Sequence, residues 1–321
     1  MHVHMKAELK ATSISFQNPT LFNTHQNTPP LPEPEELKGC LGSLDGACIE
    51  KLLLHCASAL ESNDITLAQQ VMWVLNNVAS PLGDTNQRLT SWFLRALISR
   101  ASRICPTSMN FKGSNYTIQR RLMSVTELAG EDEALVINCQ NWLRYLSDDR
   151  KGQNISLRDA FMNLVKGLNP QIVLLVDEDC DLSASSLTSR ITASFNHLWI
   201  PFDALDTFLP KDSCQRTEFE SDIGQKIENI ISFEGHQRIE RLESGMQMSQ
   251  RMKNAGYFSV PFCEETVLEV KGLLDEHASG WGMKREESML VLTWKGNSCV
   301  FATAWVPSEI RDHIGMDAHV S

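Results

Sequence analysis

The stretch ELAGEDEALVINCQNW, residues 127–142, passes from the end of a predicted helix almost directly into a short apolar run, ALVINC at 134–139. A run of this length is typical of a buried strand. A second run, QIVLLV at 171–176, follows a helical pattern over Leu157–Leu168 and precedes an amphipathic stretch, Ser185–Leu198. Alternating strands and helices indicate parallel pairing through crossovers, so this part of the chain is predicted to be α/β.

Two more apolar runs, SMLVLTW (288–294) and CVFATAW (299–305), flank the turn residues KGNS and predict an antiparallel hairpin. We therefore expect an incomplete methyltransferase-like (Rossmann-like), doubly wound sheet that ends in a hairpin. Such folds bind a cofactor over a glycine-rich turn. The sequence contains no GxGxxG, GxxxxGK[ST], GxSxG or HExxH motif. We expect no enzyme, no cofactor, and no catalytic, cofactor-binding or metal-binding residue.

Residues 46–104 have helical patterns. One apolar face is formed by Ile49, Leu52, Leu53, Cys56 and Leu60, and Ser62-Asn63-Asp64 supplies capping groups for a new helix. A seven-residue spacing, typical of a coiled coil, connects Leu53, Leu60, Leu67 and Val74. Because the capping groups interrupt this repeat, we favour an antiparallel helical packet over a continuous zipper.

The charge distribution limits the partners. A net charge of −11 argues against a general polyanion binder. Residues 85–126 nevertheless contain no Asp or Glu, and they hold seven basic residues: Arg88, Arg95, Arg100, Arg103, Lys112, Arg120 and Arg121. This acid-free window is either a solvated helix face or a docking face for an acidic partner or a nucleic-acid backbone.

The remaining features concern the ends of the chain and its compartment. Residues 1–45, rich in Asn, Gln, Thr and Pro, are predicted to be a disordered tail, and residues 309–321 a flexible one. Nine scattered cysteines without CxxC spacing argue against zinc and indicate a reducing compartment. The longest branched apolar run, IVLLV, is too short to cross a bilayer, so no membrane partner is expected.

Several segments together resemble the GRAS family of plant transcriptional regulators, in particular its Scarecrow-like members, over roughly residues 46–308. LLLHCASAL (52–60) is similar to the first leucine-rich region of the family, and the segment from WIPFDALDTFLP (199–210) to about Phe233 to its PFYRE region. The motif RIER (238–241) follows in the expected order. The tryptophans of its terminal SAW region are matched by Trp281, Trp294 and Trp305.

The chain departs from the family between the elements before 130 and after 131, where neither a VHIID segment nor part of a second leucine-rich region is found. The resemblance implies a shortened domain: a helical cap at 46–129 and a truncated core at 130–308, with residues 218–233 packed on the cap. The spacing required for that packing is present in Phe219, Ile223, Ile227, Ile230 and Ile231. Loss of the first strands should expose the edge of ALVINC or a neighbour, and apolar surface with it.

The resemblance also implies a nuclear protein that joins other transcription regulators, including GRAS homodimers or heterodimers, and contacts DNA indirectly or weakly. A shortened chain would then act as a competitor. For partner contacts the candidates are Leu53, Leu60, Leu67 and Val74, and for electrostatic contacts Arg95, Arg100 and Arg103. The alternative for the four apolar residues is the core of the packet.

Other residues of the matched motifs have structural interpretations. For Arg238 and Arg241 we expect ion pairs with acids such as Glu240 or Glu243. The three SAW tryptophans are expected in the hairpin core rather than in a ligand cage. Two other functions remain open: a methyltransferase-like enzyme or small-molecule receptor, because of the fold type, and a direct DNA-binding regulator acting through the acid-free window.

Overall fold

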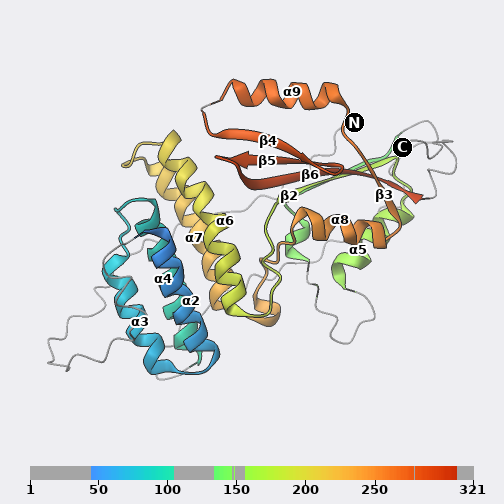
Figure 1. The fold of residues 1–321 in the computed structure, drawn as a ribbon. Helices are drawn as coiled ribbons and strands as arrows, with labels where there is room; N and C mark the ends of the chain where they lie inside the picture. Colours follow the sequence, from blue (N-terminus) through green and yellow to red (C-terminus); the bar gives the residue numbers. More distant parts are fainter. Residues whose placement is uncertain (1–44, 105–133, 147, 149–155, 278, 309–321) are drawn as a thin grey trace, which may run out of the picture.

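The computed structural model describes residues 45–104, 134–146, 148, 156–277 and 279–308, and it shows a group of helices beside an α/β part (Figure 1). The two predicted tails, apart from Asp45, lie outside the described residues. Residues 105–133 also lie outside them, and with them Lys112, Arg120 and Arg121 of the acid-free window.

The first three helices are α2 (Gly46–Glu61), α3 (Ile65–Val78) and α4 (Thr85–Ile104). Side chains cap the first two: Asp45 accepts from the Cys48 amide at 2.9 Å and Asp64 from the Leu67 amide at 3.0 Å. Between them Asn63 adopts a left-handed backbone with φ of 59°, which turns the chain. The helices are therefore separate, and the alternative of a continuous zipper is wrong.

Two later helices, α6 (Leu187–Phe208) and α7 (Cys214–Ser232), pack on the first three. The shared core includes Phe93 of α4 and Phe195 of α6, whose rings meet edge to face at 5.6 Å. We call these five described helices the cap bundle. Most of the predicted amphipathic stretch Ser185–Leu198 lies in α6, which packs in this core and is followed by another helix, α7.

Helix α7 contributes Ile227, Ile230 and Ile231 to the cap-bundle core, where all three are fully buried. Ile223 packs against the core and is only partly buried. Phe219 points away from it, with 46% of its surface exposed. The apolar contacts of α7 with the other helices of the cap bundle are thus made by its second half.

The α/β part holds one sheet whose described strands run in the order β1-β2-β6-β5-β4, with β3 paired to β6. Their bounds are β1 (Val136–Gln140), β2 (Ile172–Glu178), β3 (Tyr257–Val260), β4 (Trp281–Glu286), β5 (Met289–Trp294) and β6 (Asn297–Pro307). Strands β1 and β2 are parallel and joined through α5 (Leu157–Gly167), as the alternating pattern predicts. The predicted hairpin is β5–β6, which turns at Lys295 and Gly296, both with positive φ.

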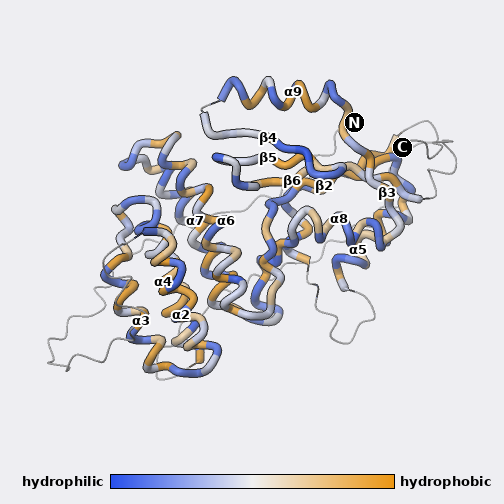
Figure 2. The backbone as a smooth tube through the Cα atoms, in the orientation of Figure 1, coloured by the Kyte–Doolittle hydropathy of each residue, from blue (hydrophilic) through white to orange (hydrophobic). Residues whose placement is uncertain are grey.

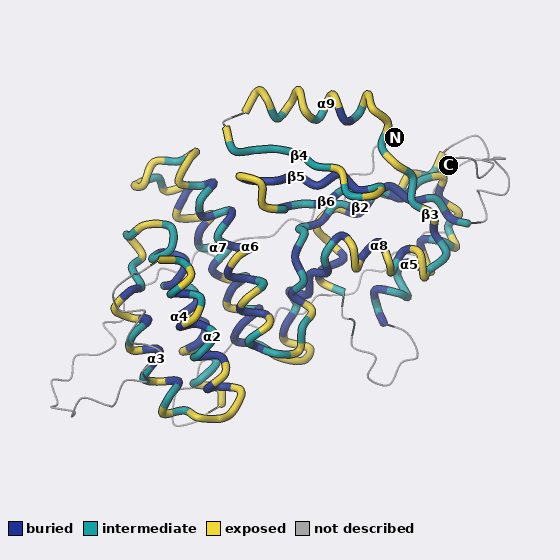
Figure 3. The backbone as a smooth tube through the Cα atoms, in the orientation of Figure 1, coloured by how far each residue is buried: buried dark blue, intermediate teal, exposed yellow. Residues whose placement is uncertain are grey.

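Helices cover the sheet unequally. Figure 1 shows α5 and α8 (Gly245–Asn254) on one side and α9 (Glu264–Asp275) on the other. The first side has a core that includes Met162, Met248, Phe301 and Trp305. Helix α9 buries only Val267 and is otherwise mostly exposed (Figure 3).

Strand β1 ends the strand order on one side of the described sheet, and Val136 on it is 51% exposed. On the side away from α5 and α8, strand β2 presents Ile172, Leu174 and Val176, each only partly buried. The apolar part of β2 is Ile172–Val176, and β5 and β6 of the same sheet are also largely hydrophobic (Figure 2). The described part of the sheet therefore leaves apolar surface accessible beside β1 and β2.

Helix α6 also borders the sheet. Its Ile200 and Ala204 form a small core with Trp294 and Cys299 of the hairpin. Asp203, on the same helix, accepts hydrogen bonds from Trp294 Nε1 at 2.7 Å and from Lys295 Nζ at 2.6 Å. One helix thus holds the cap bundle and the hairpin together.

Candidate functional site

The four residues of the seven-residue repeat lie in or against the cap-bundle core. Leu53 is fully buried and Leu60 is 4% exposed. Leu67 and Val74 are partly buried and pack against the same core. A partner could therefore reach only the exposed parts of Leu67 and Val74.

Arg100 and Arg103 lie in the second half of α4, beside the end of α7. Arg100 donates to the Ile231 carbonyl at 3.0 Å and to Glu234 at 2.8 Å. The guanidinium of Arg103 is exposed and lies over the Phe233 ring, 3.9 Å from its centroid. Both side chains contact the segment that links α7 to the rest of the chain.

Arg95 lies nearer the start of α4 and is exposed. Its guanidinium lies over the Trp92 ring, 4.9 Å from the ring centroid, an arrangement that favours a cation. Arg95 has no carboxylate partner among the residues that the structure describes. It is therefore a cation available to solvent or to a partner.

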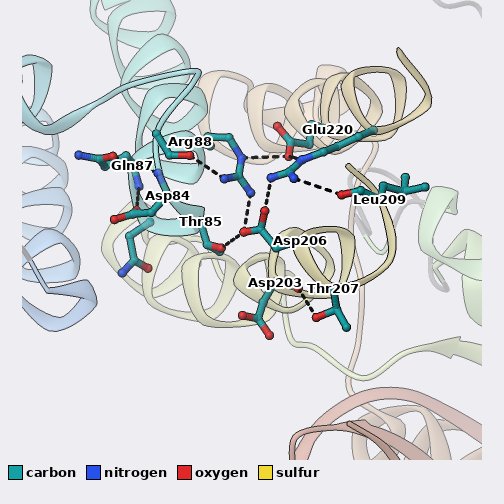
Figure 4. A network of polar contacts seen from close by, with 12 residues as sticks. Asp84, Thr85, Gln87, Arg88, Asp203, Asp206, Thr207, Leu209 and Glu220 are labelled. Atoms are coloured by element: carbon teal, nitrogen blue, oxygen red, sulfur yellow. Dashed lines mark hydrogen bonds and ion pairs between the residues drawn. The ribbon is translucent and has the colours of Figure 1, made fainter. Parts of the chain in front are cut away.

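A buried ionic network joins α4, α6 and α7 (Figure 4). Glu220 Oε1 accepts from Arg88 Nε and from Arg216 Nε, each at 3.0 Å. Asp206 accepts from Arg88 Nη2 at 2.9 Å, and also from Arg216 and Thr85. Arg88 and Arg216 are only 4% and 3% exposed. Two cations and two carboxylates thus balance one another where the three helices meet.

The network shifts the titration of its more exposed carboxylate. Burial alone would raise the pKa of Asp206, but hydrogen bonds from Thr85 and Arg88, together with the charges of Arg88 and Arg216, lower this pKa below its usual value. Asp206 therefore stays ionised at neutral pH.

A pocket of about 280 Å³ opens above this network, where the α3–α4 loop, α4 and the start of α7 meet. Arg95 and Lys211 are its exposed cations, and Leu82 is 91% exposed at its rim. The complete lining is Pro81, Leu82, Gly83, Arg88, Ser91, Trp92, Arg95, Lys211, Arg216, Thr217 and Glu220. We call it the Arg95–Lys211 pocket.

A second ionic cluster lies where the cap bundle meets the sheet. Glu178, at the end of β2, contacts His197 of α6 at 2.7 Å and Lys226 of α7. Arg144, which is 6% exposed, pairs with Glu178 at 2.5 Å and with Asp177. Burial would raise the pKa of Glu178, but the His197 hydrogen bond and the charges of Lys226 and Arg144 hold it well below its usual value. The carboxyl end of β2 is thus filled by protein charges.

Glu240 lies beside this cluster and behaves differently. It is 8% exposed, and its Oε2 has no hydrogen-bond partner among the described residues. Burial raises its pKa, and the charges of Lys226 and Arg144 offset this only in part. Its ionised form is therefore disfavoured in the folded protein.

The other motif residues have structural positions. Arg238 donates to the Leu182 carbonyl at 2.9 Å and Arg241 to the Arg238 carbonyl at 2.8 Å. Both guanidinium groups thus bind backbone carbonyls. Glu243 binds Arg158 and Arg251. These arginines fix the loop between α7 and α8.

The three tryptophans divide between two cores. Trp281 and Trp294 meet at 4.9 Å between ring centroids, with Phe208 beside both. Trp305 is 1% exposed in the separate core under α5 and α8. They do not form a common cage.

Sequence reasoning missed the Arg88–Glu220–Arg216 network and Lys211. One signal was available on α7, where Arg216 and Glu220 continue the buried stripe of Ile227 and Ile231 through Gly224, at spacings of three and four. Charged residues on the buried side of a helix indicate a partner charge on the facing helix.

The described residues contain no group of three or more His, Cys, Asp or Glu side chains that could hold a metal ion. None of the described helices is both long enough and apolar enough to span a membrane.

Comparison with known proteins gives consistent results for sequence and fold. The GRAS domain family profile matches residues 49–129 and 108–306. Scarecrow-like protein 32 of Arabidopsis thaliana is 32% identical over 423 residues, covering 92% of this chain and 100% of the relative. Protein SHORT-ROOT 1 of Oryza sativa subsp. japonica is 30% identical over 201 residues, 56% of this chain and 33% of the relative.

A solved structure agrees in fold. The crystal structure of SCL7 in Oryza sativa superposes with a TM-score of 0.67 over 80% of this chain and 99% of that chain, at 18% identity. SCL7 is a GRAS protein with a Rossmann-like fold, so the predicted fold class is confirmed.

Proposed function

Because the chain belongs to the GRAS family of transcriptional regulators, we propose that it acts in the nucleus by binding other regulators, including further GRAS proteins, through its cap bundle. The observation that carries this proposal is the closed structure of the cap bundle. Five described helices enclose one continuous core, and the bundle presents Arg95 and Arg103 on the exposed side of α4.

We propose that the chain contacts DNA through its partners rather than directly, because few of the described basic residues in the acid-free window are available to bind phosphates. Of its basic residues, Arg88 and Arg100 are held in ion pairs within the fold. Among the described residues of the window, Arg95 and Arg103 remain exposed. In this described part of the window two exposed cations neutralise few phosphates, and the affinity of a protein for DNA depends strongly on that number. Lys112, Arg120 and Arg121 lie outside the described residues.

We also propose that the chain competes with longer members of the family for their partners. The family profile matches the chain in two ranges that overlap at residues 108–129. The alignment with Scarecrow-like protein 32 is longer than this 321-residue chain, so it places gaps in the chain. Both findings support an internal deletion between the cap helices and β1. Such a chain would keep the partner contacts of the cap bundle and lack part of the domain, and so would displace longer family members.

Pairwise co-precipitation tests the proposal. The purified chain should bind at least one member of a panel that includes Scarecrow-like protein 32 and Protein SHORT-ROOT 1. Added in excess, it should lower the amount of any complex that these relatives form with each other. A chain that is folded by circular dichroism but binds no member of the panel contradicts the proposal. A fluorescent fusion that stays outside the nucleus contradicts its nuclear part.

A further inference from the structure

The Arg95–Lys211 pocket has a rigid base. Arg88, Arg216 and Glu220 line it and are held together by the ionic network below. Because each of these side chains is already bound, none has to be ordered again when something enters the pocket. A preorganised base lowers the entropic cost of binding.

The charge that remains in the pocket is positive. Glu220 and Asp206 neutralise Arg88 and Arg216, whereas Arg95 and Lys211 have no carboxylate partner in the part of the chain that the structure describes. The chain as a whole carries −11, so this is a local positive site on an acidic protein. Such a site attracts acidic groups, whether they lie on another protein or on a second copy of this acidic chain.

The pocket also has an apolar side. Leu82 is 91% exposed, Pro81 precedes it, and the half-buried Trp92 lies beneath Arg95. An occupant that satisfies both sides carries a carboxylate and a neighbouring apolar side chain. Acidic and apolar side chains alternate in many segments of proteins that bind by folding onto a partner.

The size of the pocket limits its occupant. At about 280 Å³ it lies just below the range for small-molecule sites, roughly 300–1,000 Å³. It holds one or two side chains rather than a dinucleotide. Among the described residues that line the pocket, a nucleic-acid backbone would meet two free cations, with Glu220 in the same lining.

We propose that the Arg95–Lys211 pocket docks an acidic segment of a partner protein. One carboxylate of the segment binds Arg95 and Lys211, and the adjacent apolar side chain packs on Leu82 and Trp92. This inference rests on the proposed function, because it assigns part of the partner binding to one place on the cap bundle and gives the partner's chemistry.

The test uses the full chain and a fluorescein-labelled peptide, GDELDDFG, with the neutral peptide GNQLNNFG as its control. Fluorescence anisotropy should show saturable binding of the acidic peptide alone, weakened by added salt. The double variant Arg95→Glu/Lys211→Glu should weaken binding by about tenfold or more. The exposed Lys51 of α2 lies on the same bundle outside the pocket lining, so Lys51→Glu is the matched control and should bind as wild type.

The outcomes separate the alternatives. Equal binding of both peptides, or equal binding by wild type and the double variant, overturns the proposal. Tighter binding of a single-stranded DNA of similar length overturns it in favour of a nucleic acid. Self-association of the chain that the double variant abolishes overturns it in favour of a second copy. A chain that binds GRAS relatives but not the peptide refutes the pocket alone, whereas binding to neither refutes the proposed function as well.

Discussion

Trp92 of α4 lies against the backbone of α7 at Gly224, where an added Cβ would come within 2.2 Å of the indole ring. The two helices can approach this closely because Gly224 has no side chain. The guanidinium of Arg95 lies over the same indole ring, 4.9 Å from the ring centroid. The contact between two helices thus also positions a cation of the pocket.

Gly224→Ala should destabilise the protein by about 1–2 kcal/mol, because overpacking by the methyl group exceeds the gain in helix propensity. The measurement is urea unfolding followed by circular dichroism. Gly272→Ala on α9 is the matched control: nothing lies within 4 Å of its Cβ position. It should be neutral or stabilise by up to about 1 kcal/mol. Equal stability of the Gly224 variant and wild type would contradict the contact.

Glu220→Gln should cost about 3 kcal/mol, because it leaves Arg88 and Arg216 with one carboxylate between them in a buried place. Glu218→Gln, an exposed neighbour on the same helix, should change stability by less than about 0.5 kcal/mol. Thermal unfolding of the two variants measures the difference. Similar melting temperatures for both would show that the network does not stabilise the fold.

Glu240→Gln should stabilise the protein at neutral pH. Burial raises the pKa of Glu240, so its ionised form is less favourable in the folded chain than in the unfolded chain. The penalty is present at pH values above this raised pKa and disappears below the usual pKa of a glutamate. The gain should therefore vanish as the pH falls below about 4.5.

The comparison for that variant is Glu243→Gln. Glu243 is as buried as Glu240 but binds Arg158 and Arg251. Its substitution should destabilise by about 3 kcal/mol. If both variants change stability in the same direction at neutral pH, the contrast between the two carboxylates is wrong.

Glu178→Gln should destabilise the junction of cap bundle and sheet, and the loss should depend on pH. Contacts with His197, Lys226 and Arg144 depress the pKa of Glu178, so the ionised form stabilises the fold above the unfolded pKa. The wild-type advantage should be complete at neutral pH and shrink as the pH falls below about 4.5 towards the lower folded pKa. Stability curves from pH 3 to pH 7 measure it, with the exposed Glu269→Gln of α9 as the control expected to follow wild type. A constant difference across this range would refute the role of the ionised carboxylate.

The sequence predicts the elements whose patterns are local. Helices α2, α3 and α4 follow from apolar spacing, with the cap at Asp64 marking the start of α3, and β1, β2 and the β5–β6 hairpin from short apolar runs bounded by turns. It does not reveal β3, β4, α8 or α9. Strand β4 reads WGMKRE, with charged and small residues in place of an apolar run, and its pairing with β5 fixes it instead.

The candidate site depends on contacts that are distant in the chain. Arg88 and Glu220 lie 132 positions apart, and Arg88 and Asp206 118 positions. Local spacing could place Arg95 on an exposed helix face, but it could not bring Lys211 beside it. It also put Phe219 on the apolar stripe of α7, because apolar spacing alone ignores charged residues that are buried by pairing.

Helix α6 must fit two separate packing surfaces at once, the cap-bundle core and the hairpin. Phe202 belongs to the core of the cap bundle, while Ile200 and Ala204 pack on Trp294 of the hairpin, and Asp203 binds that tryptophan. A substitution that improves packing in the cap-bundle core lies next in the chain to residues that must still contact the hairpin, and the reverse also holds. In an evolutionary lineage, changes in the helices and in the hairpin should consequently be correlated, and α6 should tolerate fewer replacements than α9, which has one buried residue.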